Sequence, residues 1–437
     1  MMKQVLQLWL FALLCTTARA ERPNVILMMA DDLGYNDVSC YGSERNRTPF
    51  LDQMADEGVR LTSFYAGASV CSPSRMALLS GSYPARLGWE RGVLGYLMEP
   101  RTGMSLDVVT IAESFRDAGY RTAMAGKWHV GAQTLGPMHQ GFDESYFILA
   151  SNNMSRDMFR GQRRIHEDYD NRLLSQAFTE EVVRLINVDS DQPFLIYVPF
   201  TAPHFPASAH PDWRGRSNNS AYGDVVEELD ARVGEILAAL KQRGIDTQTL
   251  VVFISDNGPE PNQRRFNSAA PFSGRKWNAR EGGLRVPGII RWPGSLEAGR
   301  VSDAMVSAMD LYPTLAHVCG VPINIPESGQ KLDGLNVWGS ITGEDPAQAR
   351  DELLYWHGKG KASAIRSGEF KLFFDAGEGD PNVRNGPVLY NLAEDPGETT
   401  DLSDKHPDIV AELLERARQQ LADIEQHALP IGRWSQQ

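Results

Sequence analysis

The chain has 437 residues, 42% of them hydrophobic and 23% charged, and its formal net charge is −13. This composition is typical of a globular protein, and the length suits a large domain with a smaller one attached. The negative charge excludes non-specific nucleic-acid binding as the main activity, because a phosphate backbone repels an acidic surface, although a local basic cluster can still bind an anion.

Residues 1–20 have the pattern of a secretory signal peptide. Lys3 precedes the apolar run VLQLWLFALL, and the small residues of ARA predict cleavage after Ala20. The run is too short to span a bilayer, and a buried first helix is the alternative interpretation. We therefore expect an exported protein, periplasmic or secreted, without a membrane span. Loss of Lys3 and Arg19 changes the net charge of the mature chain from −13 to −15.

Buried strands and amphipathic helices alternate through the first part of the mature chain. Apolar runs predict buried strands in NVILMMADDLG (24–34), in PFLIYVPFTAPHFP (193–206), which continues into a proline-rich loop, and in TLVVFISDNG (249–258). Thr48 is expected to cap a helix that has Pro49 at its first position, and residues 224–243 have the clearest helical period. Residues 110–129 fit a helix, a glycine turn, a strand and a loop. The alternation predicts a doubly wound α/β domain, with a large, mostly parallel sheet flanked by helices.

The composition changes near residue 321, where proline and glycine become frequent. ASAIRSGEFKLFFD (362–375) and PVLYNL (387–392) predict antiparallel strands, and residues 406–427 predict an amphipathic helix. We therefore expect a smaller C-terminal subdomain with an antiparallel sheet and a helix. The predicted parts are the signal peptide at 1–20, the main α/β domain at 21–320 and the C-terminal subdomain at 321–437.

Acidic side chains directly follow two of the predicted strands. Asp31 and Asp32 come after the first strand, and Asp256 and Asn257 come after TLVVFIS. In open α/β sheets, ligands bind beyond the carboxyl ends of the strands, and carboxylate and amide oxygens suit Ca²⁺ or Mg²⁺ and not zinc. Taken singly, the first pair also fits a helix cap and the second a hairpin turn. Together, after two strands of the same type, the pairs favour a metal site.

Cys71 is one of three cysteines in the mature chain, with Cys40 and Cys319, so at least one of them cannot pair. If a helix begins near Pro73, Cys71 lies at its N-terminus and Arg75 follows one turn later on the same side. Free N–H groups and a guanidinium there suit a tetrahedral oxyanion. A small buried cysteine beside a surface arginine is the alternative. The four-residue spacing and the amide lost at Pro73 disfavour a thiolate phosphatase.

Four further residues could supply charge and protons. Lys127 and His129 in AGKWHVG point the same way if the backbone is extended, His204 lies in TAPHFP, and Lys276 precedes EGG. Each one alone also fits an exposed or structural loop residue. As a group beside a divalent metal, they provide proton transfer and charge for an oxyanion. This combination predicts cleavage of an ester of a multiply charged acid.

These segments resemble the type I sulfatases of the alkaline phosphatase superfamily. CSPSR (71–75) matches their C-x-P-x-R signature, and GYRTAMAGKWHVG (119–131) is similar to their second signature. ADDLGYNDVSCYG and SDNG resemble their metal-binding segments, and EGGLRVPGIIRWPG and LYNLAEDPGETTDLS resemble other family landmarks. The resemblance covers nearly the whole mature chain. It implies an alkaline-phosphatase-like fold, sulfate ester hydrolysis, and oxidation of Cys71 to formylglycine by a formylglycine-generating or anaerobic maturation enzyme.

The resemblance also implies a role for each site residue. Arg75 would orient the hydrated aldehyde, Lys127 would bind sulfate, and His129 would be the base of the elimination step. His204 and Lys276 would contact the sulfate and help to protonate the leaving oxygen. The implied ligands of Ca²⁺, or alternatively of Mg²⁺, are Asp31, Asp32, Asp256, Asn257 and the formylglycine at position 71.

Two other functions remain open. One is a phosphate mono- or diesterase on the same fold, and the other is a noncatalytic protein that binds sulfated glycans with an unmodified Cys71. Export favours a sulfated carbohydrate, often a polysaccharide, as the substrate. The charged segment FRGQRRIHEDYDN fits either a substrate-binding loop or a solvated one. The predicted substrate contacts are Arg91, Arg101, Arg163, Arg164, His166, Trp213 and Arg280.

Overall fold

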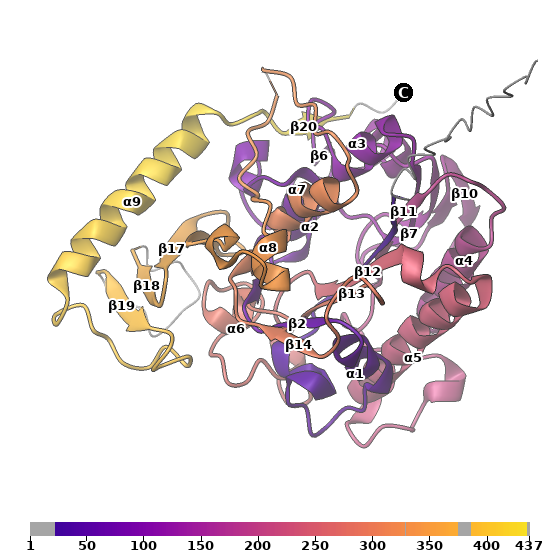
Figure 1. The fold of residues 1–437 in the computed structure, drawn as a ribbon, viewed down its shortest axis with the longest axis horizontal. Coiled ribbons are helices and arrows are strands. Elements are labelled where there is room, and N and C mark those ends of the chain that lie inside the picture. The colour runs from indigo at the N-terminus through magenta and orange to yellow at the C-terminus, as the bar shows by residue number, and fades with distance from the viewer. Residues whose placement is uncertain (1–21, 328, 375–385, 435–437) are drawn as a thin grey trace, which may run out of the picture.

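The computed structural model describes residues 22–327, 329–374 and 386–434 of the chain. The predicted signal peptide at residues 1–20 lies outside these ranges. Figure 1 shows a main body built around one large sheet, with a small second sheet and the long helix α9 (Pro407–Gln426) together at one side.

A mixed sheet of ten strands forms the centre of the main body. The strand order is β10-β9-β8-β7-β11-β1-β12-β13-β2-β14, and β9 and β13 run against the other eight. This arrangement confirms the large, mostly parallel sheet. Its strands are β1 (Asn24–Ala30), β2 (Val59–Leu61), β7 (Arg121–Lys127), β8 (Glu144–Ile148), β9 (Met158–Arg160), β10 (Arg163–His166), β11 (Phe194–Pro199), β12 (Thr249–Ser255), β13 (Gly288–Arg291) and β14 (Arg300–Ser302).

Strand β1 is apolar along its whole length because both of its faces are covered. Its residues from Val25 to Ala30 are at most 1% exposed. Successive side chains of a strand point to opposite faces, so alternate residues enter two separate cores. Val25, Leu27 and Met29 belong to one core, and Ile26, Met28 and Ala30 belong to the other.

Helices cover both faces of this sheet. One core is completed by α1 (Pro49–Asp56), α4 (Leu174–Ile186) and α5 (Ser220–Arg243), and the other by α2 (Cys71–Ser80), α3 (Ile111–Asp117) and α7 (Leu311–Val318). Helix α1 follows Thr48 as predicted. Helix α5 begins at Ser220, four residues before the predicted start, because Tyr222 in the added turn is buried and donates a hydrogen bond to Asp37. The short helices are α6 (Glu281–Leu284) and α8 (Trp338–Thr342).

The C-terminal part contains an antiparallel sheet with the order β16-β17-β18-β19. Both predicted strand regions are present, and β16 is an additional strand that the sequence did not predict. Helix α9 buries Leu413, Ala417 and Ile424 against the main core. The strands are β16 (Glu352–Trp356), β17 (Ala362–Ser367), β18 (Phe370–Phe373) and β19 (Val388–Asn391), and the small paired strands elsewhere are β3 (Phe64–Tyr65), β4 (Val93–Leu94), β5 (Leu97–Met98), β6 (Thr102–Gly103), β15 (Val306–Ser307) and β20 (Gly432–Arg433).

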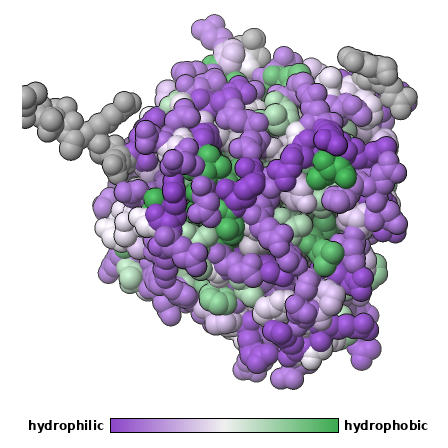
Figure 2. All heavy atoms as spheres, turned by 90° about the vertical axis from the view of Figure 1, so that its right-hand side faces the viewer, coloured by the Kyte–Doolittle hydropathy of each residue, from purple (hydrophilic) through white to green (hydrophobic). Residues whose placement is uncertain are grey.

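The face of the molecule that carries α4 and α5 is mostly hydrophilic, with small and separate hydrophobic areas (Figure 2). None of the helices in the described ranges combines the length and the apolar character that crossing a bilayer requires. The three cysteines within those ranges, Cys40, Cys71 and Cys319, are all free, so Cys40 and Cys319 do not form the pair that the sequence left open.

Candidate active site

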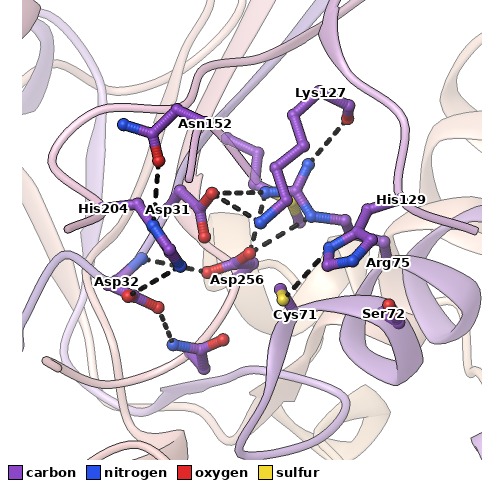
Figure 3. Close-up of polar contacts among 12 residues, drawn as sticks. Asp31, Asp32, Cys71, Ser72, Arg75, Lys127, His129, Asn152, His204 and Asp256 are labelled. Atoms are coloured by element: carbon purple, nitrogen blue, oxygen red, sulfur yellow. Dashed lines mark hydrogen bonds and ion pairs between the residues drawn. The ribbon is translucent and has the colours of Figure 1, made fainter. Parts of the chain in front are cut away.

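The predicted site residues converge at the carboxyl ends of four neighbouring strands. Strands β7, β11, β1 and β12 lie side by side in parallel, so their ends meet at one edge of the sheet. Lys127 ends β7, His204 follows β11, and Asp31 and Asp256 directly follow β1 and β12. Figure 3 shows these side chains pointing toward one another around Cys71 and Arg75 of α2.

Helix α2 places Cys71 and Arg75 on the side that faces the strand ends. Cys71 is the first helical residue, two positions before Pro73. Arg75 is completely buried, donates two hydrogen bonds to Asp256 Oδ2 at 2.8 and 3.2 Å, and donates a third to the Lys127 carbonyl at 2.9 Å. The alternative of a surface arginine is therefore wrong, and the predicted position of Cys71 at a helix N-terminus is confirmed.

Four oxygen-bearing side chains form a buried acidic cluster. Asp31, Asp32, Asp256 and Asn257 each have 0% exposure. Among the described residues, Asp31 Oδ1 and Asn257 Oδ1 are buried without a hydrogen-bond partner. Oxygens of Asp31 and Asp256 and the sulfur of Cys71 lie within 4.8 Å of one another. Buried oxygen atoms normally accept a hydrogen bond, so the two oxygens without a partner, Asp31 Oδ1 and Asn257 Oδ1, are suited to bind a hard cation.

The two alternative interpretations of the acidic pairs are wrong. Gly34, and not Asp31 or Asp32, caps the short helical turn at Tyr35–Asp37. Asp256 and Asn257 do not form a hairpin, because the antiparallel partner of β12 is β13, which begins only at Gly288. Instead, Asp32 N–H donates to Asp256 Oδ1 at 3.1 Å, which joins the two pairs directly.

Each carboxylate of the cluster has a cationic partner. Lys127 Nζ lies 2.6 Å from Asp31 Oδ2, Lys276 Nζ lies 2.8 Å from Asp32, and Arg75 pairs with Asp256. Burial opposes the charged form of Asp31, but the combined attraction of Lys127 and the other nearby cations outweighs it and lowers the Asp31 pKa. Asp31 is therefore ionised at neutral pH, as a metal ligand needs to be.

The two predicted histidines both lie in the site. His129 Nδ1 is 3.3 Å from Cys71 Sγ, and His204 Nε2 is 3.7 Å from Asp32 Oδ2. Burial, followed by the charge of a nearby lysine, lowers the pKa of both rings, to about 4 for His204. The expectation of an extended backbone from Lys127 to His129 is wrong, because β7 ends at Lys127 and His129 has a φ of +57°.

Two residues that the sequence analysis missed support the site. Asn152 Oδ1 lies 3.0 Å from His204 Nδ1, and Glu260 Oε2 lies 3.4 Å from Lys276 Nζ. Asn152 follows β8, another strand that ends at the same edge, and this position just beyond a strand is the sequence signal that identifies it. Glu260 lies four residues beyond Asp256 in a loop whose path the sequence does not reveal.

The predicted substrate contacts are not gathered in one place. Arg163 begins β10 and pairs with Arg160, the last residue of β9, whereas His166 pairs with Met158, which pairs with the last residue of β8. His166 is therefore near the edge that carries the acidic cluster, and Arg163 is toward the opposite edge. Arg280 is 5% exposed and donates to Ser273 and to the Glu398 carbonyl. Arg91, Arg101 and Arg164 are exposed, and Trp213 is half-buried.

Comparisons with known proteins agree with this geometry. A family model described as Sulfatase matches residues 23–321, and a second, N-sulphoglucosamine sulphohydrolase, C-terminal, matches residues 275–427. Arylsulfatase A of Homo sapiens is 33% identical over 458 residues, which cover 94% of this chain and 89% of that protein. The structure of PsFucS1 sulfatase from Pseudoalteromonas sp. has a TM-score of 0.83 and 26% identity, and covers 94% of this chain and 92% of its own.

A further similar structure is that of Ps i-CgsB in complex with k-i-k-neocarrahexaose. Its TM-score is 0.81 at 27% identity, over 94% of this chain and 95% of its own. These matches extend over nearly the whole described chain, and they include both the main sheet and the C-terminal part. The chain therefore belongs to the sulfatase family, and it is a sulfuric ester hydrolase with the alkaline-phosphatase-like fold.

Proposed function

We propose that this protein is an exported, calcium-dependent sulfatase that cleaves a sulfate ester of a carbohydrate with a formylglycine made from Cys71. The observation that carries the proposal is the position of Cys71. Its sulfur faces His129 Nδ1 at 3.3 Å on one side and lies within 4.8 Å of carboxylate oxygens of Asp31 and Asp256 on the other. A nucleophile at this position meets both a base and the ligands of a cation.

His129 is suited to accept a proton at position 71. Its Nε2 lies 3.1 Å from the Leu94 carbonyl, which can only accept a hydrogen bond, so the neutral ring carries its proton on Nε2. The lone pair of Nδ1 then faces residue 71. Burial, followed by the repulsion of Lys127, keeps the pKa of His129 well below its ordinary value, so the ring is neutral near pH 7.

The modified residue and the metal supply the remaining chemistry. Hydrated formylglycine at position 71 would supply two hydroxyls, one as the nucleophile toward sulfur and one whose deprotonation would release sulfate. A bound Ca²⁺ would supply a Lewis acid for the sulfate ester. Its ligands would be Asp31, Asp32, Asp256 and Asn257, and the unpartnered oxygens of Asp31 and Asn257 support this set. An all-oxygen set of this kind favours Ca²⁺ or Mg²⁺ over transition metals.

Three buried cations would hold the charge of the sulfate. Arg75 would orient the hydrated aldehyde from the first turn of α2, and Lys127 and Lys276 would contact the sulfate oxygens. His204 Nδ1 lies 2.7 Å from the Phe205 carbonyl, so the neutral ring holds its proton there and leaves Nε2 facing the site. Proton donation from Nε2 to the leaving oxygen therefore requires the doubly protonated ring, which the negative charge of the bound sulfate ester would favour.

The substrate class rests on the predicted export and on the relatives. Ps i-CgsB, which is similar over most of its length, was solved with a neocarrahexaose. We therefore assign a sulfated carbohydrate to this chain as well. The exposed residues Arg91, Arg101, Arg164 and His166 and the half-buried Trp213 remain proposed contacts to a long substrate. Arg163 and Arg280 are less suited to contact the substrate, because Arg163 lies toward the opposite edge of the sheet and Arg280 is buried with its own partners.

Paired aryl sulfate and aryl phosphate substrates test the reaction. We expect a clear preference for sulfate, and a preference for phosphate would favour the phosphoesterase alternative. The mass of the peptide that contains residue 71 tests the nucleophile in protein made with its maturation enzyme. An unmodified thiol in an active sample would refute the formylglycine mechanism, and Cys71→Ala is the inactive control. Desulfation of defined sulfated oligosaccharides then identifies the sugar.

A further inference from the structure

The entrance to the site lies on the side of His204 and Lys276. Cys71, Lys127 and His129 are at most 1% exposed, whereas His204 is 7% and Lys276 is 5% exposed. A sulfate ester therefore approaches residue 71 past these two side chains. The group that carries the ester has to remain outside, against the residues that surround the entrance.

Large apolar side chains are exposed around this entrance. Phe205, next to His204, is 47% exposed, and Met154, two residues beyond Asn152, is 42% exposed. Tyr96 and Leu97 on the far side of the entrance are 56% and 48% exposed. The methyl group of Met154 lies against Gly95, so the two sides approach each other. Exposed apolar groups that gather at a catalytic entrance indicate a ligand-binding surface.

Tyr96, Leu97 and Trp277 line one cleft of about 570 Å³ that also reaches Lys276. The rings of Tyr96 and Trp277 meet edge to face, with centroids 5.9 Å apart and an angle of 77° between the planes. This volume lies within the range of small-molecule sites. Two perpendicular aromatic faces beside a catalytic lysine form a wall for a flat ring.

The backbone of this wall is strained. Trp277 has a φ of +82° and Leu97 a φ of +64°, values that bulky side chains rarely adopt. Trp277 is held on both sides, because its N–H donates to the Ser69 carbonyl at 2.9 Å and its carbonyl accepts from Gly358 N–H at 3.0 Å. A Cβ on Gly358 would lie 2.3 Å from the indole ring. Glycine adopts such a φ without strain, so a tryptophan at position 277 indicates that its side chain has a role.

We propose that Tyr96, Leu97 and Trp277 form the subsite for the leaving group and bind the apolar face of the pyranose ring that carries the sulfate. This inference rests on the proposed sulfatase function and adds the residues that select the substrate. The indole follows Lys276 directly, so a ring stacked on it keeps its ester close to the cations of the site. An aryl ring also has a flat apolar face, and the experiment distinguishes binding of a sugar ring from binding of an aryl ring.

The test compares KM values with the inhibition constant of inorganic sulfate. The probes are 4-methylumbelliferyl sulfate, galactose 6-sulfate and N-acetylgalactosamine 6-sulfate. We expect Trp277→Ala to raise KM for a sulfated sugar about tenfold, which corresponds to about 1.4 kcal/mol of lost binding. Trp277→Phe should recover part of this loss. Inhibition by sulfate, which needs no leaving-group subsite, should not change, and neither value should change in Val301→Ala, an exposed residue on the edge strand β14.

Three results would overturn the proposal. The first is an unchanged KM of Trp277→Ala for sulfated sugars. The second is a loss of inhibition by sulfate as large as the increase in KM, which would show that Trp277 only holds Lys276 in place. The third is an increase in KM for the aryl ester alone. Tyr96→Ala gives an independent result should Trp277→Ala fail to fold, because Tyr96 is 56% exposed. If the wild-type enzyme cleaved none of the sulfate esters, the proposed function would fail, which is distinct from failure of the subsite.

Discussion

Lys371 of β18 joins the C-terminal sheet to the loop that carries Lys276 through a buried ionic cluster. Its side chain is completely buried, and its Nζ lies 3.0 Å from Glu281 Oε1 and 2.8 Å from Glu398 Oε1. Glu398 Oε2 also accepts hydrogen bonds from Glu281 N–H and from the Ser273 hydroxyl, both at 2.9 Å. These contacts fix both ends of residues 273–281, the segment that carries Lys276.

We predict that Lys371→Met destabilises the protein by about 3 kcal/mol or more. Methionine has a similar length, so the change removes the cation and leaves the space filled. Two buried carboxylates would then lose their shared partner, and breaking a buried pair in this way costs about 3–5 kcal/mol. Burial already raises the pKa of Glu398, and Lys371 opposes this effect. Glu281 keeps Tyr65 and Arg285 as partners, so the lower end of the range applies.

Urea unfolding followed by tryptophan fluorescence measures this change. Lys405→Met is the matched control, because Lys405 is exposed, and we expect its effect to stay within about 0.5 kcal/mol. Adding Glu398→Gln to Lys371→Met removes one of the uncompensated charges and should restore part of the stability. A loss below about 1 kcal/mol in the single variant would refute the reasoning from buried charge.

Three further outcomes are expected. Arg75→Lys should lower kcat/KM about 100-fold in an aryl sulfatase assay, because lysine cannot reproduce the paired hydrogen bonds to Asp256. A decrease of less than about tenfold would contradict a role of Arg75 in orienting the nucleophile. Ca²⁺ at about 100 times its Kd should stabilise the protein by about 2.7 kcal/mol in thermal unfolding, and Asn257→Ala should reduce this gain. Burial raises the pKa of Asp230 to about 7 in the folded protein. Its protonation therefore stabilises the fold fully below about pH 4, and this contribution is lost as the pH rises through 7. Asp230→Asn should make the free energy of unfolding depend less on pH between these values.

The strand ends were predictable because their signal is local. An apolar run followed by acidic residues identifies both a buried strand and the edge where its ligands lie, and this reasoning found Asp31, Asp32, Asp256 and Asn257. The start of α2 was predictable from Pro73 for the same reason. The backbone at His129 was not, since its left-handed conformation depends on packing between β7 and the Leu94 carbonyl. Strand β16 pairs with β17, the next strand in the chain, so its signal is local and was overlooked in the run ELLYW. The cleft at Trp277 was missed because it joins segments distant in sequence, Tyr96 and Leu97 with residues 274–278.

The ion pairs of the site show why local sequence patterns cannot predict which side chains pair. Lys127 and Asp31 are 96 residues apart, Arg75 and Asp256 are 181 apart, and Lys276 and Asp32 are 244 apart. Each of these six side chains is at most 5% exposed, so none could remain charged without its partner. A sequence can identify each residue as a ligand or an oxyanion contact by its place in a motif. The pairing itself depends on the order of strands in the sheet, because that order places the ends of β1 and β12, which carry the three carboxylates, beside the three cations.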